Sequence, residues 1–125
     1  MQVLQINPLE TIVVDQDRLG ALYSQLGEAG AEDVVCRALE ELALRLSHCE
    51  TLYNEQCWQD LRKNTRSLIA IADQIGMSAL SQVAGDVTYS IDRKDTVAVA
   101  ATLSRLLRVG ERSLSAVWNI PDLST

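Results

Sequence analysis

Few residues of this chain have the chemistry of a metal ligand or of a nucleophile. The cysteines are Cys36, Cys49 and Cys57, and the one histidine is His48. The cysteines form no C-x-x-C pair, and a single histidine cannot complete a zinc set with them at a familiar spacing. We therefore expect no metal site and no cofactor, and we interpret the cysteines as small hydrophobic residues.

Acidic side chains give no clearer sign of catalysis. Asp73 and Asp86 can be considered as a carboxylate pair, but acidic residues on helices are mostly solvated, and neither has a visible partner that would act as nucleophile or base. We therefore expect a protein that is not an enzyme.

His48 needs separate consideration as a phosphoryl acceptor. It lies off the apolar stripe of its predicted helix, so we expect it to be exposed. Its sequence neighbours include no lysine, and Glu50 adds repulsion toward phosphate. The simplest interpretation is a surface histidine.

Composition and charge exclude several classes of function. The chain has 125 residues and a net charge of −6, and its basic residues form only one loose group, Arg62, Lys63 and Arg66. Nucleic-acid binding requires clustered basic residues, so this class is not expected. No apolar run approaches the roughly 20 residues that span a bilayer. An odd number of cysteines without a signal peptide predicts reduced thiols and a cytoplasmic location.

The apolar residues repeat at helical spacing through most of the chain. With five aromatic residues and no phenylalanine, the core must be built from Leu, Ile, Val and Ala, which favours packed helices. Asp15 is expected to cap a short helix that ends at Gly27. Longer helices are expected over about 31–53, 56–75, 78–91 and 96–120, with Gly76 ending the second of these four and Ser78 and Asp95 capping the next two.

Short connections between these helices require antiparallel neighbours. The sequence therefore predicts an all-α, antiparallel up-down four-helix bundle with a short N-terminal helix. Residues 15–120 would form this single domain, residues 1–14 an N-terminal arm and residues 121–125 a C-terminal tail. The predicted core includes Leu42, Leu46, Leu68, Ala72, Val83 and Leu107.

The helix over 56–75 presents the most distinctive surface. At about 100° per residue, one side is polar and points away from the predicted core, while Ile69 lies at its border. Ala70 is small among long polar neighbours and leaves a dent beside Arg66. We predict a partner-binding face made of Arg62, Lys63, Arg66, Ile69, Ala70 and Asp73.

The same helix carries a family resemblance. The segment RSLIAIADQIGM, residues 66–77, resembles the central motif of histidine-containing phosphotransfer (Hpt) domains, with Ser67, Leu68, Ala72, Ile75 and Gly76 in register. The stretch DQDRLGALYSQLG, residues 15–27, is similar to the short first helix of that family. The resemblance covers roughly residues 13–118 and implies the Hpt fold.

The departures from the motif fall on its chemical residues. Arg66 stands where the family has its phosphoacceptor histidine, Ile69 where it has a lysine, and Ala70 where it has a glycine. A guanidinium is permanently protonated and is not a nucleophile at neutral pH. The resemblance therefore implies a degenerate member: a pseudo-phosphotransfer module of bacterial two-component phosphorelays that binds a receiver or histidine kinase domain without accepting phosphate.

Other interpretations remain open. The chain can be a structural homodimer or subunit that associates through Ile69, the N-terminal arm, or exposed Leu44 and Leu52. It can also be an active phosphotransfer protein that uses His48. No membrane or nucleic-acid partner is expected in any of these cases.

Overall fold

The structure, a computed structural model, describes residues 15–118, which are helical except at residue 15 and in the short turns between helices. The helices are α2 (Gln16–Asn54), α3 (Trp58–Gln74), α4 (Ser78–Asp92) and α5 (Thr96–Trp118). No strand occurs in this part of the chain, which confirms the all-helical class. The predicted arm and tail, residues 1–14 and 121–125, lie outside the described residues.

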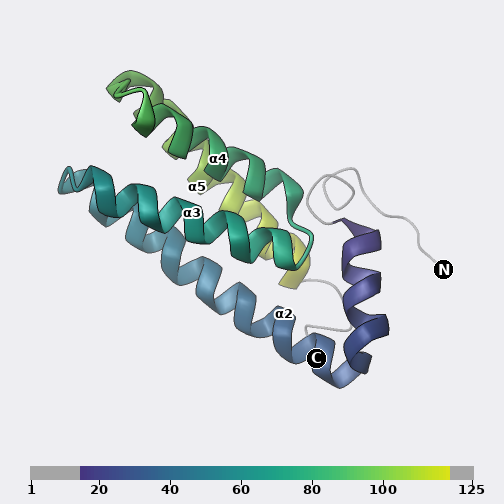
Figure 1. The fold of residues 1–125 in the computed structure, drawn as a ribbon. Coiled ribbons are helices and arrows are strands. Elements are labelled where there is room, and N and C mark those ends of the chain that lie inside the picture. Colours follow the sequence, from purple (N-terminus) through teal and green to yellow (C-terminus); the bar gives the residue numbers. More distant parts are fainter. Residues whose placement is uncertain (1–14, 119–125) are drawn as a thin grey trace.

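Helix α2 is two helices joined at Gly27. This residue has φ 78° and ψ 168°, a conformation in which glycine has no steric penalty, so the helix breaks where the sequence predicts. The segment before Gly27, purple in Figure 1, turns away from the long axis of the remaining helices. Asp15 caps its start as predicted, because its carboxylate accepts the N–H groups of Asp17 and Arg18 at 3.0 and 3.2 Å.

Each of the three turns between the helices ends its helix in the same way. Gln56, Gly76 and Lys94 all have positive φ, and the next residue donates its N–H back to the helix that has just ended. This is the hydrogen-bond pattern of the Schellman motif. The predicted cap at Asp95 is confirmed, because its carboxylate accepts the N–H of Ala98 at 3.0 Å. The predicted cap at Ser78 is wrong: Ser78 is already helical, and Met77 precedes it without a side-chain cap.

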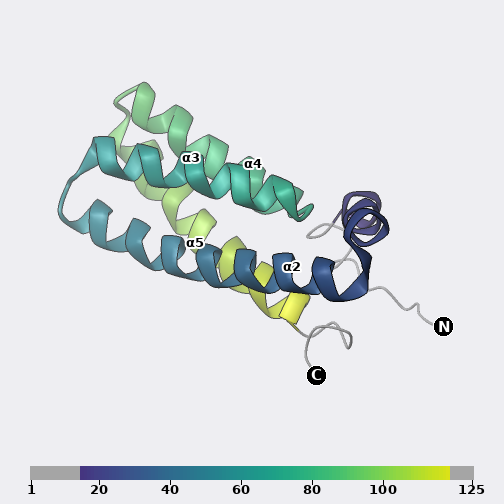
Figure 2. The same cartoon turned by 60° about the horizontal axis from the view of Figure 1, so that its bottom comes forward.

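The four helices enclose one core. Contacts join α2 to α3, α3 to α4, α4 to α5 and α5 back to α2. Figures 1 and 2 show the part of α2 after Gly27, α3, α4 and α5 lying side by side, with the chain turning back at each connection. Helix α3 therefore has α2 on one flank and α4 on the other.

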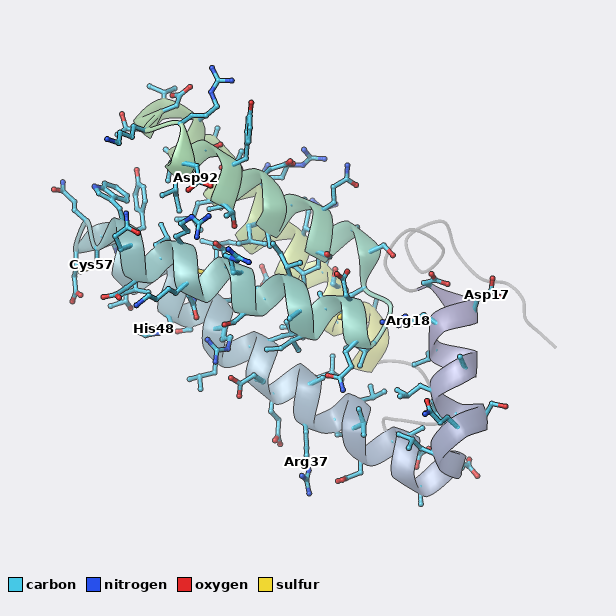
Figure 3. All side chains as sticks on the ribbon, viewed as in Figure 1. Asp17, Arg18, Arg37, His48, Cys57 and Asp92 are labelled. Carbon is cyan, nitrogen blue, oxygen red and sulfur yellow. The ribbon has the colours of Figure 1, made fainter. Side chains whose placement is uncertain are left out.

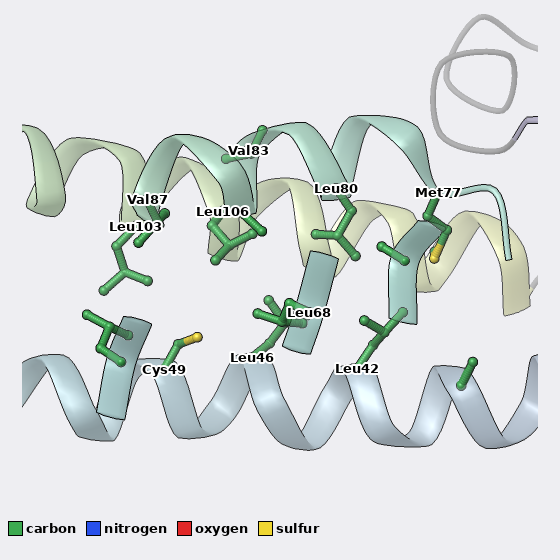
Figure 4. Packing of buried hydrophobic residues seen from close by; sticks show 14 of the residues in the cluster. Leu42, Leu46, Cys49, Leu68, Met77, Leu80, Val83, Val87, Leu103 and Leu106 are labelled. Carbon is green, nitrogen blue, oxygen red and sulfur yellow. The ribbon is translucent and has the colours of Figure 1, made fainter. Parts of the chain in front are cut away.

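Aliphatic side chains fill the space between the helices, as Figure 4 shows. The predicted core residues Leu42, Leu46, Leu68, Ala72 and Val83 are buried. Leu107 is only half-buried, which corrects the prediction. Leu106 is fully buried, and a step of about 100° around the helix moves Leu107 to the flank of α5.

Two surface leucines were predicted on α2, and one of them is confirmed. Leu44 is 66% exposed. Leu52 is buried, so its predicted exposure is wrong. It follows Cys49 by three residues and therefore lies near the same side of α2, where the core is. No helix in residues 15–118 is both long and apolar enough to cross a membrane.

The start of α2 is attached to the turn between α3 and α4. The N–H of Asp15 donates to the carbonyl of Gly76, and Nε of Arg18 donates to the carbonyl of Asp73 at 3.1 Å. Gly76 has φ 78°, and a Cβ added there would lie 2.9 Å from the carbonyl oxygen of Asp15. Only glycine therefore combines this backbone conformation with so close an approach.

We predict that Gly76→Ala lowers the free energy of unfolding by about 1–3 kcal/mol, because alanine is strained at this φ and crowds Asp15. Denaturant unfolding followed by circular dichroism measures the change. The matched control is Gly20→Ala, since Gly20 is helical and a Cβ there meets no atom within 4 Å. The control should leave stability unchanged or raise it by about 0.5–1 kcal/mol. Equal stability of the Gly76 variant and the wild type would show that this turn is not constrained.

Candidate functional site

The six residues predicted to form a face on α3 occupy four different environments. Arg62 lies toward α4, where it pairs with Asp92, whereas Lys63 lines a hollow that it shares with residues of α2. Asp73 is exposed at the end of α3, beside the start of α2. Figure 3 shows Asp92 on α4 and His48 on α2, on opposite flanks of α3. The part of the face that stays together is Arg66, Ile69 and Ala70.

Arg62 holds α3 to α4. Its Nε and Nη2 atoms donate to the two carboxylate oxygens of Asp92 at 2.6 and 3.1 Å, the fork geometry in which an arginine–carboxylate pair is most specific. The hydrogen bond from Arg62 lowers the pKa of Asp92, and the charges of Arg62 and Arg66 lower it further. Arg62 is therefore already engaged within the fold, at a position with considerable solvent exposure.

Arg66 is exposed and has no such fixed partner. Among residues 15–118, no carboxylate lies within ion-pair distance of it, although its charge acts on Asp92. Ala70, one helical turn further on, is also exposed, and Ile69 is half-buried against the core. An unpaired guanidinium thus stands beside a small residue and an aliphatic one.

The neighbouring surface of α4 leaves room beside these residues. The hydroxyl oxygens of Thr65 and Thr88 lie 2.8 Å apart and fix how α3 and α4 are aligned. Gly85 precedes Thr88 on α4 by about one helical turn. A Cβ added at Gly85 would meet nothing within 4 Å, so the space next to it is open.

Buried polar residues fix α3 to both of its neighbours. Asn64 is 4% exposed and donates from Nδ2 to the carbonyl of Arg45 at 2.7 Å and to Sγ of Cys49 at 3.1 Å. Its Oδ1 accepts from Nη1 of Arg45 at 3.0 Å, so both ends of the amide are satisfied on α2. Thr65 is fully buried and makes the corresponding contact to α4. Adjacent residues of α3 therefore set its position against two helices.

Sequence reasoning missed Asn64, Thr88 and Asp92 as members of this arrangement. Arg62 and Asp92 lie at nearly equal distances in sequence from the turn at Gly76, as do Thr65 and Thr88. Two helices joined by a short turn bring such positions together, so this symmetry was a usable signal. Asn64 was also detectable, since on the wheel it lies within about 60° of both Leu61 and Leu68, on the inward side of the helix.

His48 lies in surroundings that the local sequence does not indicate. It is exposed, as predicted, but it lines a shallow hollow of about 290 Å³ between α2 and α3. Its sequence neighbours include no lysine, but the fold brings Lys63 of α3 to the same hollow. The complete lining is Arg45, His48, Leu52, Asp60, Lys63, Asn64 and Ser67.

The cysteines are free thiols, and the buried one is chemically quiet. Burial raises the pKa of Cys49 to about 11, against smaller opposing effects of the Asn64 hydrogen bond and the Arg45 charge. A thiol is nucleophilic as the thiolate, so Cys49 stays protonated and unreactive near neutral pH. Cys36 and Cys57 are half-buried and unpaired. Within residues 15–118, no three His, Cys, Asp or Glu side chains are grouped to hold a metal ion.

Comparison of the chain with protein-family models, with curated proteins and with solved structures finds no match.

Proposed function

We propose that this protein is a non-catalytic, Hpt-like signalling module that docks a receiver or histidine kinase domain of a two-component phosphorelay and does not itself accept phosphate. In this proposal the helices form an antiparallel up-down bundle of the Hpt type. The observation that carries it is Arg66, which is exposed, has no ion-pair partner among residues 15–118 and stands at the position that corresponds to the family's phosphoacceptor histidine.

Arg66 suits docking and not phosphotransfer. Its guanidinium has five N–H donors, no lone pair to offer at neutral pH, and a planar fork that matches carboxylates. Ala70, one helical turn from Arg66, is small and exposed and lets another surface approach that fork closely. An acidic patch on a partner domain is the complementary surface.

The surface around Arg66 is held in place by contacts between α3 and α4 in the free protein. The Arg62–Asp92 pair and the Thr65–Thr88 contact fix α3 against α4, so binding would order few additional groups. Tyr89 on α4 is 60% exposed, and Nη1 of Arg93 donates to its hydroxyl at 2.9 Å while the guanidinium lies 5.5 Å from the ring centre. A rigid exposed aromatic of this kind is a typical interface anchor.

The two alternative functions would use other residues than Arg66 and Ala70. A structural homodimer or subunit would use Ile69, the N-terminal arm or surface leucines of α2, and of these leucines Leu44 remains available whereas Leu52 is buried. An active phosphotransfer protein would use His48, and the observation in its favour is the hollow that it shares with Lys63. Asp60 lines the same hollow and opposes an anionic phosphoryl group there.

The direct test of the docking proposal is capture of partners from the native cell lysate, followed by quantitative binding with the purified partner. We expect a receiver-containing or kinase protein to be enriched. Arg66→Glu reverses the charge at the centre of the face, and Ala70→Trp fills its dent. Each variant should weaken binding by about 1–2 kcal/mol, measured by calorimetry.

Both variants should remain folded, since exposed substitutions usually change stability by less than about 0.5 kcal/mol. His48→Ala and Leu44→Ala are the matched controls on α2 and should bind as the wild type does. If the controls abolish association while the Arg66 and Ala70 variants bind normally, the docking face lies elsewhere and the structural alternative replaces this proposal.

We also predict that the protein stays unphosphorylated when incubated with acetyl phosphate or with a phosphorylated receiver. Arginine at position 66 cannot accept the phosphoryl group, and His48 lies outside the motif. Phosphate-affinity electrophoresis and mass spectrometry under conditions that preserve phosphohistidine provide the measurement. Acid-labile phosphate that disappears in His48→Ala would instead establish the phosphotransfer alternative.

A further inference from the structure

The end of the bundle opposite to the Gly76 turn contains an apolar hollow. It has a volume of about 280 Å³, near the lower end of the range of small-molecule sites, which is roughly 300–1,000 Å³. Its wall is predominantly apolar and comes from the beginnings of α3 and α5 and the end of α4. The lining residues are Trp58, Gln59, Ile91, Lys94, Thr96 and Val99.

Rigid side chains make up the apolar part of this hollow. Ile91 and Val99 belong to the core, so the hollow reaches down to the packed interior. The ring of Trp58 meets the ring of Tyr53 edge to face, with centroids 5.8 Å apart and an interplanar angle of 68°. This contact restrains the indole in the wall. A flat hydrophobic group can pack against Trp58, Ile91 and Val99 without ordering flexible side chains.

Lys94 supplies the one charged group of the lining. Among residues 15–118, no carboxylate forms an ion pair with it, and the adjacent Asp95 uses its carboxylate to cap α5. Lys94 has φ 56° at the turn after α4, a position where glycine is the usual residue. A lysine in this left-handed conformation is strained.

We propose that this hollow binds a small aromatic carboxylate. The ring packs against Trp58, Ile91 and Val99, and the carboxylate pairs with the ammonium group of Lys94. Binding is non-covalent and involves no residue of the Arg66 face, so this inference stands independently of the proposed function.

The test uses 1-naphthaleneacetate as the probe and 1-naphthaleneacetamide as its neutral match. Isothermal titration calorimetry of the full chain should give saturable binding of the acid with one site per molecule. The amide should bind roughly fivefold more weakly, because a partly exposed ion pair contributes about 1 kcal/mol at most. In NMR spectra of isotope-labelled protein, the changes in chemical shift should centre on the backbone amides of Trp58, Lys94 and Val99.

Lys94→Gly separates the ligand role of this residue from its structural one. Glycine relieves the left-handed conformation, so the variant should melt at a higher temperature than the wild type and yet bind the acid only as weakly as the amide. Gln56→Gly is the matched control. Gln56 has φ 58° in the equivalent turn after α2 and does not line the hollow, so its variant should also gain stability but bind the acid normally.

Three results would overturn the proposal. They are absence of saturable binding by 1-naphthaleneacetate, equal affinities for the acid and the amide, and an acid affinity in Lys94→Gly that matches the wild type. Val99→Trp provides a second check, because it should block the hollow for both probes. Unchanged binding in a folded Val99→Trp protein would place the ligand elsewhere.

Discussion

The position of α3 depends on two adjacent polar residues that are buried in a largely aliphatic interior. Asn64 satisfies its amide on α2, and Thr65 meets Thr88 on α4. A buried polar group left without its partner costs roughly 1–3 kcal/mol, whereas a shift of either helix by one residue would separate these pairs. The contacts therefore select one alignment from the many that leucine and alanine packing alone would tolerate. The orientation of Arg66 follows from that alignment.

A second constraint acts at the far end of α3. The turn at Gly76 connects α3 to α4, and the carbonyl of Gly76 also accepts the N–H of Asp15 at the start of α2. Gly76 thus connects the end of α3 to the start of α2. Arg18 adds a hydrogen bond to the carbonyl of Asp73, so the last turn of α3 is fixed by a distant part of the sequence. Asp73 consequently belongs to this junction, apart from the surface around Arg66.

Local sequence signals were sufficient for the helices and for most of their ends. The aliphatic spacing located the buried stripes, and Asp15, Gly27, Gly76 and Asp95 act at helix ends for the reasons that predicted them. Ser78 failed because α4 begins one residue earlier than expected, so that Met77 holds the N-cap position and Ser78 is the first helical residue.

Contacts between helices were harder to foresee. The polar face drawn from one helix alone grouped Arg62, Lys63 and Asp73 with Arg66. In the fold Arg62 lies toward α4, whereas Lys63 and Asp73 lie beside different parts of α2. A helical wheel gives the direction of a side chain relative to its own axis and contains no information on what lies beside it. Similarly, the environment of His48 depends on Lys63, fifteen residues away, which only the packing of α2 against α3 brings near. The implied Hpt-like role remains a proposal that rests on Arg66 and its surroundings.

The measurement that tests the docking account most directly is amide hydrogen–deuterium exchange of the protein with and without a bound receiver domain. The account predicts added protection in the middle of α3, from Arg62 to Asp73, and in the facing part of α4 around Gly85, with α2 near His48 and Leu44 unaffected. Protection confined to α2 or α5, with exchange in α3 unchanged, would contradict it.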